Sequence, residues 1–364
     1  MFCRVRVSDT VSSSDNKSPA GGINTDTRSS IGSEANIAAT GPYYSHPISP
    51  VSYARDVRLD SLIWGDKWQD GNGKAASLTY SFGRTDSVYD PDYSELFRYG
   101  WQGLTRQLTD NQEAAITKAL KVWGNVAKLD FEQVIDSSKV AGDLRFSRID
   151  FFGNPPALGL PPGSTKELFG NTGGHPMEGD VWLSNGSFLH DVSDGSYGLS
   201  TILHEIGHAL GLKHPHDPGR TSTIAPPSND WLGHSVMSYR SYEGAPLTGY
   251  TADRFPSTPI LNDIAAIQHI YGAKASFNSG NTTYRWQPGE EIFETIWDGG
   301  GVDMIDWSNQ ASDAVINLRP GKWSELGPAY DPDILTSGNP LEKRTLTIAY
   351  DAEIENARGG SGDD

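Results

Sequence analysis

The sequence His204-Glu-Ile-Gly-His208-Ala-Leu-Gly211-Leu-Lys-His214 predicts a helix that ends in a tight turn and carries three histidines. His204 and His208 are four residues apart, so on a helix both imidazoles leave the same face and can converge on one ion. Gly211 lacks a Cβ and can adopt a left-handed conformation, which ends the helix and brings His214 back as a third ligand. Three neutral imidazoles suit zinc and leave a fourth position open, as in a catalytic rather than a structural site.

Glu205 follows the first histidine directly and, on a helix, points toward a water molecule rather than toward the ion. We expect Ser200 or Thr201 to cap this helix. Its apolar surface comes from Ile202, Leu203, Ile206, Ala209, Leu210 and Leu212. A bare H-E-x-x-H can occur by chance, and a lone helical histidine is more often a hydrogen-bonded residue than a ligand. Gly211 and His214 at fixed offsets make the longer pattern specific, and it predicts a zinc-dependent hydrolase.

Residues 204–214 resemble the long zinc signature of the metzincin metalloproteases, which a methionine turn follows. Ser235-Val-Met237-Ser-Tyr239 matches that turn, so Met237 would form the hydrophobic floor beneath the metal. Among metzincins, the serralysins carry a tyrosine two residues after the methionine, which binds zinc or swings away to stabilise the oxyanion, and Tyr239 occupies this position. The resemblance implies one catalytic zinc ion held by His204, His208, His214 and Tyr239, with Glu205 and Tyr239 as the catalytic residues.

The resemblance extends over roughly residues 60–364 and implies an α+β catalytic domain with a twisted mixed sheet, long helices and a zinc cleft. Strands are expected at 77–82 and 143–147. Residues 179–184 resemble the edge strand along which serralysins bind extended substrate. The segment 155–174 contains two Pro-Pro pairs and Gly-Gly, and we expect it to be a long loop before the edge strand.

Two further helices are expected in the catalytic domain. The first runs from Leu108 to Val126, with Thr109 as its cap and Glu113 in the first turn. The second is predicted at 262–271, because isoleucines recur there at helical spacing, and it would be the closing helix of the catalytic domain.

Composition divides the chain into three predicted parts. Residues 1–45 are rich in Ser, Asn, Gly and Thr, which indicates a disordered leader or propeptide. Residues 46–271 would form the catalytic domain. Residues 272–364, where Gly, Asn, Asp and Thr increase, resemble the first part of a calcium-binding, all-β parallel β-roll domain.

The segment Trp297-Asp298-Gly-Gly-Gly-Val-Asp303-Met-Ile-Asp306 matches the serralysin calcium turn, in which carboxylates and glycine carbonyls are the ligands. The resemblance implies one or more structural calcium ions, with ligands Asn278, Gly280, Thr282, Asp298, Gly300, Gly301 and Asp303. Serralysins usually have arginine at position 278, where the contact is made by a backbone carbonyl. Residues 359–364 open a glycine-rich calcium nonapeptide, so we expect the chain to be a truncated or processed form of a longer protein.

The formal net charge of −17 and the pI near 4.9 argue against nucleic acid and anionic membranes as partners. No apolar run is long enough to span a bilayer. Cys3 is the only cysteine, so an intramolecular disulfide is excluded, and its neighbours show no switch motif that would block zinc. The resemblance implies a secreted monomer that acts on proteins and peptides, with a proteinaceous inhibitor as a further partner. Export would use a Gram-negative type I system whose C-terminal signal lies beyond Asp364.

The expected function is a zinc-dependent endopeptidase of broad specificity that uses zinc-activated water and Glu205 as general base. One alternative is an inactive or zymogen-like calcium-dependent surface or adhesion protein that keeps the protease fold; loss of Glu205 or of a ligand would favour it, and none is lost. Another is a zinc hydrolase that acts on something other than protein. His216, two residues after the third histidine, is expected to be a surface loop residue without a catalytic role.

Overall fold

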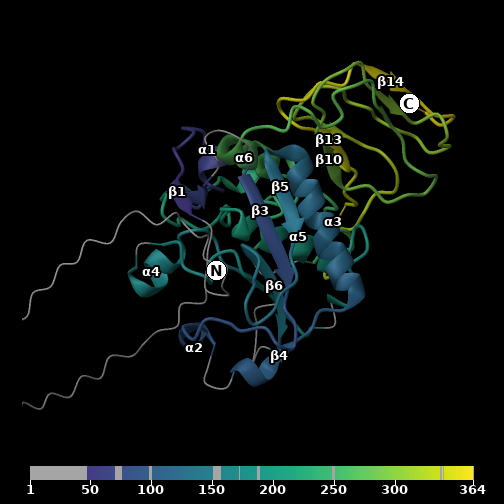
Figure 1. Ribbon diagram of the computed structural model, residues 1–364. Helices are drawn as coiled ribbons and strands as arrows, with labels where there is room; N and C mark the ends of the chain where they lie inside the picture. Colours follow the sequence, from purple (N-terminus) through teal and green to yellow (C-terminus); the bar gives the residue numbers. More distant parts are fainter. Residues whose placement is uncertain are drawn as a thin grey trace, which may run out of the picture. The chain divides into compact units, whose positions relative to one another are not determined.

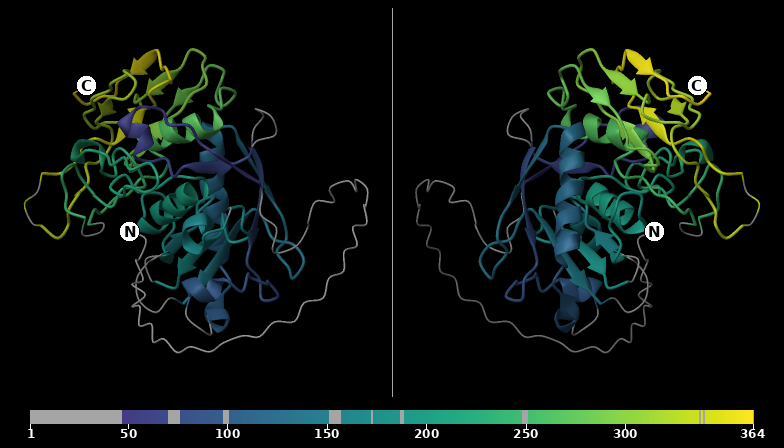
Figure 2. Two further views of the ribbon diagram at one scale, coloured as in Figure 1. Left: turned by 90° about the vertical axis from the view of Figure 1, so that its left-hand side faces the viewer. Right: turned by 90° about the vertical axis from the view of Figure 1, so that its right-hand side faces the viewer.

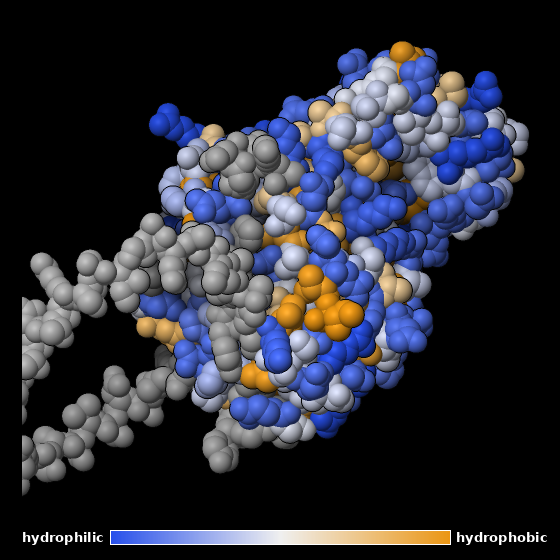
Figure 3. All heavy atoms as spheres, in the orientation of Figure 1, coloured by the Kyte–Doolittle hydropathy of each residue, from blue (hydrophilic) through white to orange (hydrophobic). Residues whose placement is uncertain are grey.

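The computed structural model describes residues 47–69, 76–97, 101–150, 157–171, 173–186, 189–247, 251–336, 338 and 340–363 (Figure 1). The expected leader at 1–45, including Cys3, lies outside the described residues. Within the described part of the chain, no helix has the length and apolar character needed to cross a membrane. The face shown in Figure 3 is mostly hydrophilic, with an apolar patch near its centre.

A six-stranded mixed sheet forms the framework of the catalytic region. Its strands are β3 (Ala76–Phe82), β4 (Thr105–Arg106), β5 (Leu129–Gln133), β6 (Leu144–Ile149), β7 (Ala157–Gly159) and β8 (Val181–Ser184). Along the order β5-β3-β6-β8-β7 the first four strands pair in parallel, whereas β7 and the short β4 pair antiparallel. β3 and β6 confirm the strands predicted at 77–82 and 143–147.

The strand predicted at 179–184 exists as β8, but the prediction that it is the edge strand is wrong. β7 lies along it with Leu158 opposite Trp182, so β7 takes the edge position. The predicted long loop at 155–174 therefore contains β7 and also the helix α4 (Thr165–Phe169). All four residues of β8 are buried, as in a strand covered by neighbours, whereas β7 is only three residues long and too short to give a periodic signal.

Three longer helices occur in this described region: α3 (Asp110–Val126), α5 (Tyr197–Ala209) and α6 (Leu261–Tyr271). α3 packs on β5 and α5 on β7 and β8, whereas α6 packs on α1 (Val57–Asp60) and α3. α3 begins at Asp110 and is capped by Thr109, as predicted, and a capping box joins Thr109 to Gln112. Figure 2 shows α3 alongside α5, where the Trp123 indole donates a hydrogen bond of 3.3 Å to the carbonyl of Leu203. Trp123 is fully buried, and burial of a side chain of this size contributes roughly 1.5–3 kcal/mol or more.

After α6 the chain forms short strands that stack in parallel. These are β9 (Thr283–Tyr284), β10 (Glu294–Ile296), β11 (Met304–Asp306), β12 (Trp323–Ser324), β13 (Leu346–Ile348) and β14 (Asn356–Arg358). β9, β11 and β14 form one parallel sheet; β10 and β13 pair in parallel in a second sheet, which β12 joins antiparallel. This arrangement confirms the predicted start of a parallel β-roll.

The remaining elements are short. They are β1 (Ile48–Pro50), α1 (Val57–Asp60), β2 (Asp66–Trp68), α2 (Tyr93–Leu96) and the 3-10 turns Trp101–Leu104 and Pro227–Asn229. β1 and β2 pair with each other, and the bridge between Ile63 and Leu212 ties the segment before β2 to the chain just after α5.

Candidate metal centre

The helix α5 carries the first two histidines and begins one turn earlier than predicted. Its cap is Ser196, whose hydroxyl accepts a hydrogen bond of 3.1 Å from the amide of Leu199. The predicted cap at Ser200 or Thr201 is therefore wrong. Thr201 lies inside the helix, and its hydroxyl donates to the carbonyl of Tyr197, a local bond that lets a threonine sit in a helix interior.

The predicted turn at Gly211 is confirmed. α5 ends at Ala209, and Gly211 has φ = +102°, which disfavours residues with a Cβ. A Cβ at this position would also lie 2.7 Å from the carbonyl oxygen of Asp66. The turn sends the chain back across the end of α5, and His214 returns to the two helical histidines.

The three histidines form a buried cluster, each between 4% and 6% exposed. The Nε2 atom of His214 lies 3.1 Å from Nε2 of His204 and 3.1 Å from Nε2 of His208. The Nδ1 atoms of His204 and His208 lie 2.8 and 2.9 Å from the carbonyls of Val236 and Leu212. A carbonyl can only accept, so Nδ1 carries the proton in both rings and Nε2 presents a lone pair.

This donor set fits a zinc ion. The Nε2 lone pairs of His204 and His208 both lie 3.1 Å from Nε2 of His214. A proton on that nitrogen can satisfy only one of them, whereas a cation between the three nitrogens is bound by all three. In a tetrahedral site with Zn–N bonds of about 2.0–2.1 Å, ligand nitrogens are about 3.3 Å apart, close to the observed spacing. The carbonyls behind the rings fix the tautomer, as the outer partners of metal-binding histidines do.

Burial keeps the three imidazoles neutral. It lowers the pKa of His208 to about 4 and, together with the neighbouring rings, lowers the pKa of His204 and of His214 well below its ordinary value. At neutral pH all three side chains are therefore in the form that binds a metal.

Glu205 lies between α5 and the edge strand β7. Burial raises the pKa of its carboxyl to about 8, against an opposing hydrogen bond from the backbone of Gly159. A Cβ on Gly159 would lie 2.5 Å from the carbonyl oxygen of Glu205 and 3.1 Å from its Oε2. The glycine therefore allows β7 to approach the carboxylate directly.

The methionine turn lies under the histidines. A Cβ on Gly207 would lie 2.5 Å from the sulfur of Met237, so the fully buried Met237 contacts α5 between the two helical histidines. Asp263 holds the turn, because its carboxylate accepts from the Ser235 hydroxyl at 2.6 Å and from the amide of Val236 at 2.8 Å.

Tyr239 stands beside the cluster. Its ring centroid is 4.5 Å from that of His214 and 5.7 Å from that of His204, and its plane is nearly parallel to His204. Burial raises the pKa of Tyr239, so its hydroxyl keeps its proton at neutral pH in the metal-free protein. The structure thus brings together all the residues that the sequence predicted for the zinc site.

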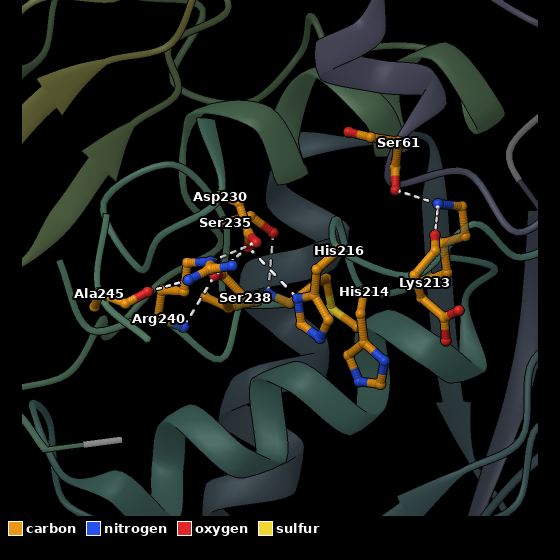
Figure 4. Close-up of polar contacts among 12 residues, drawn as sticks. Ser61, Lys213, His214, His216, Asp230, Ser235, Ser238, Arg240 and Ala245 are labelled. Atoms are coloured by element: carbon orange, nitrogen blue, oxygen red, sulfur yellow. Dashed lines mark hydrogen bonds and ion pairs between the residues drawn. The ribbon is translucent and has the colours of Figure 1, made fainter. Parts of the chain in front are cut away.

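Two residues near the site were misjudged or missed. His216, predicted to be a surface loop residue, has only 12% of its side chain exposed and stacks almost parallel on His214, with centroids 5.2 Å apart. The fully enclosed ammonium of Lys213 donates to the carbonyls of Ser61, Asp217 and Thr223 at 2.5–2.9 Å (Figure 4). These bonds hold the chain on both sides of the third histidine.

The predicted calcium ligands also lie together, in two adjacent loops. The amide of Thr282 donates to Asp303 Oδ1 at 2.6 Å, and a Cβ on Gly301 would lie 2.6 Å from the carbonyl oxygen of Gly280. Asp298 Oδ1 accepts from the amide of Gly300 at 2.7 Å. The second oxygen of Asp303 is buried without a hydrogen-bond partner, which suits a cation bound by oxygen ligands. Asn278 has a left-handed backbone (φ = +48°), which asparagine tolerates better than most residues.

Fold and site together define a metzincin, and the matrixin family matches residues 95–226. The serralysin C-terminal family of M10 peptidases matches residues 262–364. Serralysin B of Dickeya chrysanthemi is 30% identical over 318 residues, which cover 82% of this chain and 60% of the relative. Metalloprotease AprA of Pseudomonas entomophila (strain L48) is 31% identical over 327 residues, covering 84% and 61%. Serralysin of Proteus mirabilis is 28% identical over 339 residues, covering 85% and 62%.

The chain belongs to the serralysin-type metzincins. It spans about three fifths of the length of these curated relatives.

Proposed function

We propose that this protein is a zinc-dependent endopeptidase that cleaves proteins and peptides outside the cell. The observation that carries the proposal is the convergence of three buried, neutral imidazoles with a buried carboxyl directly beside them. Loss of a ligand or of Glu205 would favour the alternative of an inactive surface or adhesion protein, and all four residues are present.

His204, His208 and His214 would hold the zinc ion, with Tyr239 as a fourth, displaceable ligand. When bound, zinc supplies a Lewis acid that polarises the scissile carbonyl and makes a water molecule more acidic. Glu205 takes the proton of the attacking water and delivers it to the leaving amine. Its raised pKa in the metal-free protein is lowered by a nearby cation, which leaves a carboxylate able to accept a proton. The Tyr239 hydroxyl donates a hydrogen bond to the developing oxyanion.

The substrate would bind as an extended strand along β7. An edge strand offers backbone hydrogen bonds that require no particular side chain, which is consistent with broad specificity. Leu158 of β7 is partly exposed, and Gly159 of the same strand lies against Glu205. A peptide paired with β7 would therefore pass close to the general base.

The remaining assignments follow from the family and the charge. We infer that residues 1–45 are a leader or propeptide, 46–271 the catalytic domain and 272–364 the beginning of the calcium-binding roll. Calcium would be held by the seven residues predicted from the sequence, and an acidic protein of net charge −17 suits a calcium-loaded extracellular environment. Secretion by a type I exporter, a monomeric state and recognition by a proteinaceous inhibitor belong to the same proposal.

Casein cleavage tests the proposal. The purified protein is assayed as isolated, after removal of metal by a chelator, and after addition of zinc in calcium-containing buffer. We expect activity to disappear and return with zinc. Glu205→Gln should remove activity because it removes the general base. Its control is Glu167→Gln, which changes an exposed glutamate and should retain activity. A folded, zinc-loaded protein without its leader that leaves casein intact would contradict the proposal.

A further inference from the structure

Asp230 is a buried carboxylate that holds both chain neighbours of Tyr239. Its Oδ1 accepts a hydrogen bond of 2.5 Å from the Ser238 hydroxyl, and its Oδ2 accepts one of 2.9 Å from Nε of Arg240 (Figure 4). Asp230 itself is only 2% exposed. Tyr239 is the single residue between the two donors, so one rigid group fixes the chain on both of its sides.

Further bonds tighten this connection. The Ser238 hydroxyl also accepts from the amide of Arg240 at 3.1 Å. The guanidinium of Arg240 donates from Nη1 to the carbonyl of Ala245, and the carbonyl of Arg240 accepts from the amide of Leu232 at 2.8 Å. Ser238 is completely buried, so its hydroxyl has no access to water as a replacement partner.

The same carboxylate reaches the loop behind the third histidine. Nδ1 of His216 lies 3.5 Å from Asp230 Oδ1, and the His216 ring lies against both His214 and Tyr239, with centroids 5.2 and 5.0 Å away. Burial works to raise the pKa of Asp230, but the interactions with His216, Ser238 and Arg240 outweigh it and lower the pKa. Asp230 is therefore ionised at neutral pH, and its bonds to Ser238 and Arg240 are charge-assisted.

We propose that Asp230 is a positioning residue that sets where Tyr239 stands relative to the three histidines, acting through Ser238 and Arg240. The proposal rests on the proposed endopeptidase function, in which Tyr239 binds the metal or stabilises the oxyanion. A group with such a role must be held closely, because a misplacement of about 1 Å can lower a rate by about 10²-fold.

A double-mutant cycle tests whether Asp230 acts through Tyr239. Ser238→Ala and Arg240→Lys are each made in the wild-type and in the Tyr239→Phe protein, and kcat and KM are measured for one peptide. We expect each variant to lower kcat by roughly ten- to a hundredfold in the wild type, with KM and zinc content little changed. In Tyr239→Phe the same substitutions should cause no further loss, because the hydroxyl that they misplace is absent.

Ser235→Ala is the matched control. Ser235 is a buried serine of the same turn, but it donates to Asp263 rather than to Asp230. Its loss should therefore lower kcat by the same factor in both backgrounds. Ser238→Thr, which restores a hydroxyl, should recover part of the activity that Ser238→Ala loses. If Ser238→Ala and Arg240→Lys lower kcat equally in both backgrounds, Asp230 has only a structural role and the proposal is wrong.

Copper substitution gives a readout that does not depend on activity. A phenolate ligand on Cu²⁺ produces a visible charge-transfer band, which Tyr239→Phe abolishes. We expect Ser238→Ala to weaken or shift the band and Ser235→Ala to preserve it. Identical spectra for the wild type and Ser238→Ala would overturn the proposal.

The two proposals fail in distinguishable ways. A zinc-loaded wild type that does not cleave casein contradicts the endopeptidase function, whereas the copper spectra still report on Asp230. Asp230→Asn removes the buried charge itself and carries the greater risk of misfolding. Ser238→Ala leaves the bond between Asp230 and Arg240 in place, so the test does not depend on Asp230→Asn.

Discussion

Replacement of Gly159 by alanine tests the close packing of β7 against the helix that carries the active-site residues. The added methyl carbon would lie 2.5 Å from the carbonyl oxygen of Glu205, 3.1 Å from Glu205 Oε2 and 3.1 Å from Cβ of His208. Ordinary contacts are about 3.5 Å, so β7 and α5 must separate by roughly 1 Å. The nearest atom belongs to the backbone of a helix, and a side-chain rotation cannot relieve the contact.

The expected cost has two parts. Overpacking of this kind lowers the free energy of unfolding by about 1–3 kcal/mol. A displacement of roughly 1 Å at Glu205 and along β7 lowers kcat/KM by up to about 10²-fold. Denaturant unfolding with zinc bound gives the first quantity, and hydrolysis of one peptide at equal zinc content gives the second.

Gly103→Ala is the control, because a Cβ at Gly103 meets no atom within 4 Å and its backbone is not in the left-handed region. It should change stability by less than about 0.5 kcal/mol and leave kcat/KM unchanged. If Gly159→Ala behaves like Gly103→Ala, β7 and α5 are not packed as the structure has them, and the placement of Glu205 against the edge strand is wrong.

Three further predictions follow from buried groups. Burial raises the pKa of Asp180 to about 7 from an ordinary 3.8, so the folded protein holds this proton more tightly than the unfolded chain does. The resulting stabilisation of the folded state is complete below about pH 4 and is lost as the pH rises through 7. Asp180→Asn should therefore be more stable than the wild type at pH 8, by at most about 4 kcal/mol, and the difference in the free energy of unfolding should be smaller at pH 4.5. Urea unfolding at both pH values measures this difference, and equal values would contradict the prediction. Lys213→Met leaves three carbonyls without their donor, so it should lower the free energy of unfolding by about 3 kcal/mol and weaken zinc binding. Urea unfolding and zinc titration measure the two effects, and an unchanged urea midpoint would count against the role of the ammonium. Gly207→Ala should destabilise the protein because its methyl group meets the side chain of Met237. In a Met237→Ala background the same substitution should stabilise the protein by up to about 1 kcal/mol through helix propensity. A change in the free energy of unfolding with the same sign in both backgrounds would refute the contact.

The part of the site that the sequence predicts is the part built from local geometry. His204 and His208 share a helix face because they are four residues apart, and Gly211 is required at the turn because its backbone is left-handed and lies close to Asp66. The capped start of α3 at Thr109 is equally local. Patterns of this kind depend on neighbours in the sequence, so they can be identified before the fold is known.

The wrong predictions concern the ends and neighbours of elements. The cap of α5 is Ser196 rather than Ser200 or Thr201, since each of these residues has a hydroxyl that can accept from an amide two or three positions further along the chain. The resemblance predicts that 179–184 is the edge strand, and β7, which takes that position, has only three residues and gives no periodic signal of its own. Which strand lies at an edge depends on pairing between distant segments, and the sequence of β8 alone does not determine it.

The missed residues act through contacts that are long-range or lie outside any motif. Asp230 precedes Tyr239 by nine positions, and no spacing rule links a carboxylate there to the two neighbours of a tyrosine. Lys213 reaches Ser61, which is 152 residues away in the chain. His216 follows a ligand closely, but only its stacking on His214 reveals that it is enclosed.

The most direct test of the central claim compares the wild type with Glu205→Gln at matched zinc occupancy. Zinc per chain is determined first, and hydrolysis of one peptide is then followed under identical conditions. The account predicts one zinc ion per chain in both proteins and a loss of turnover by at least about 10²-fold in Glu205→Gln, because the amide cannot accept the proton of the attacking water. Hydrolysis at the wild-type rate by a zinc-loaded Glu205→Gln protein would contradict it.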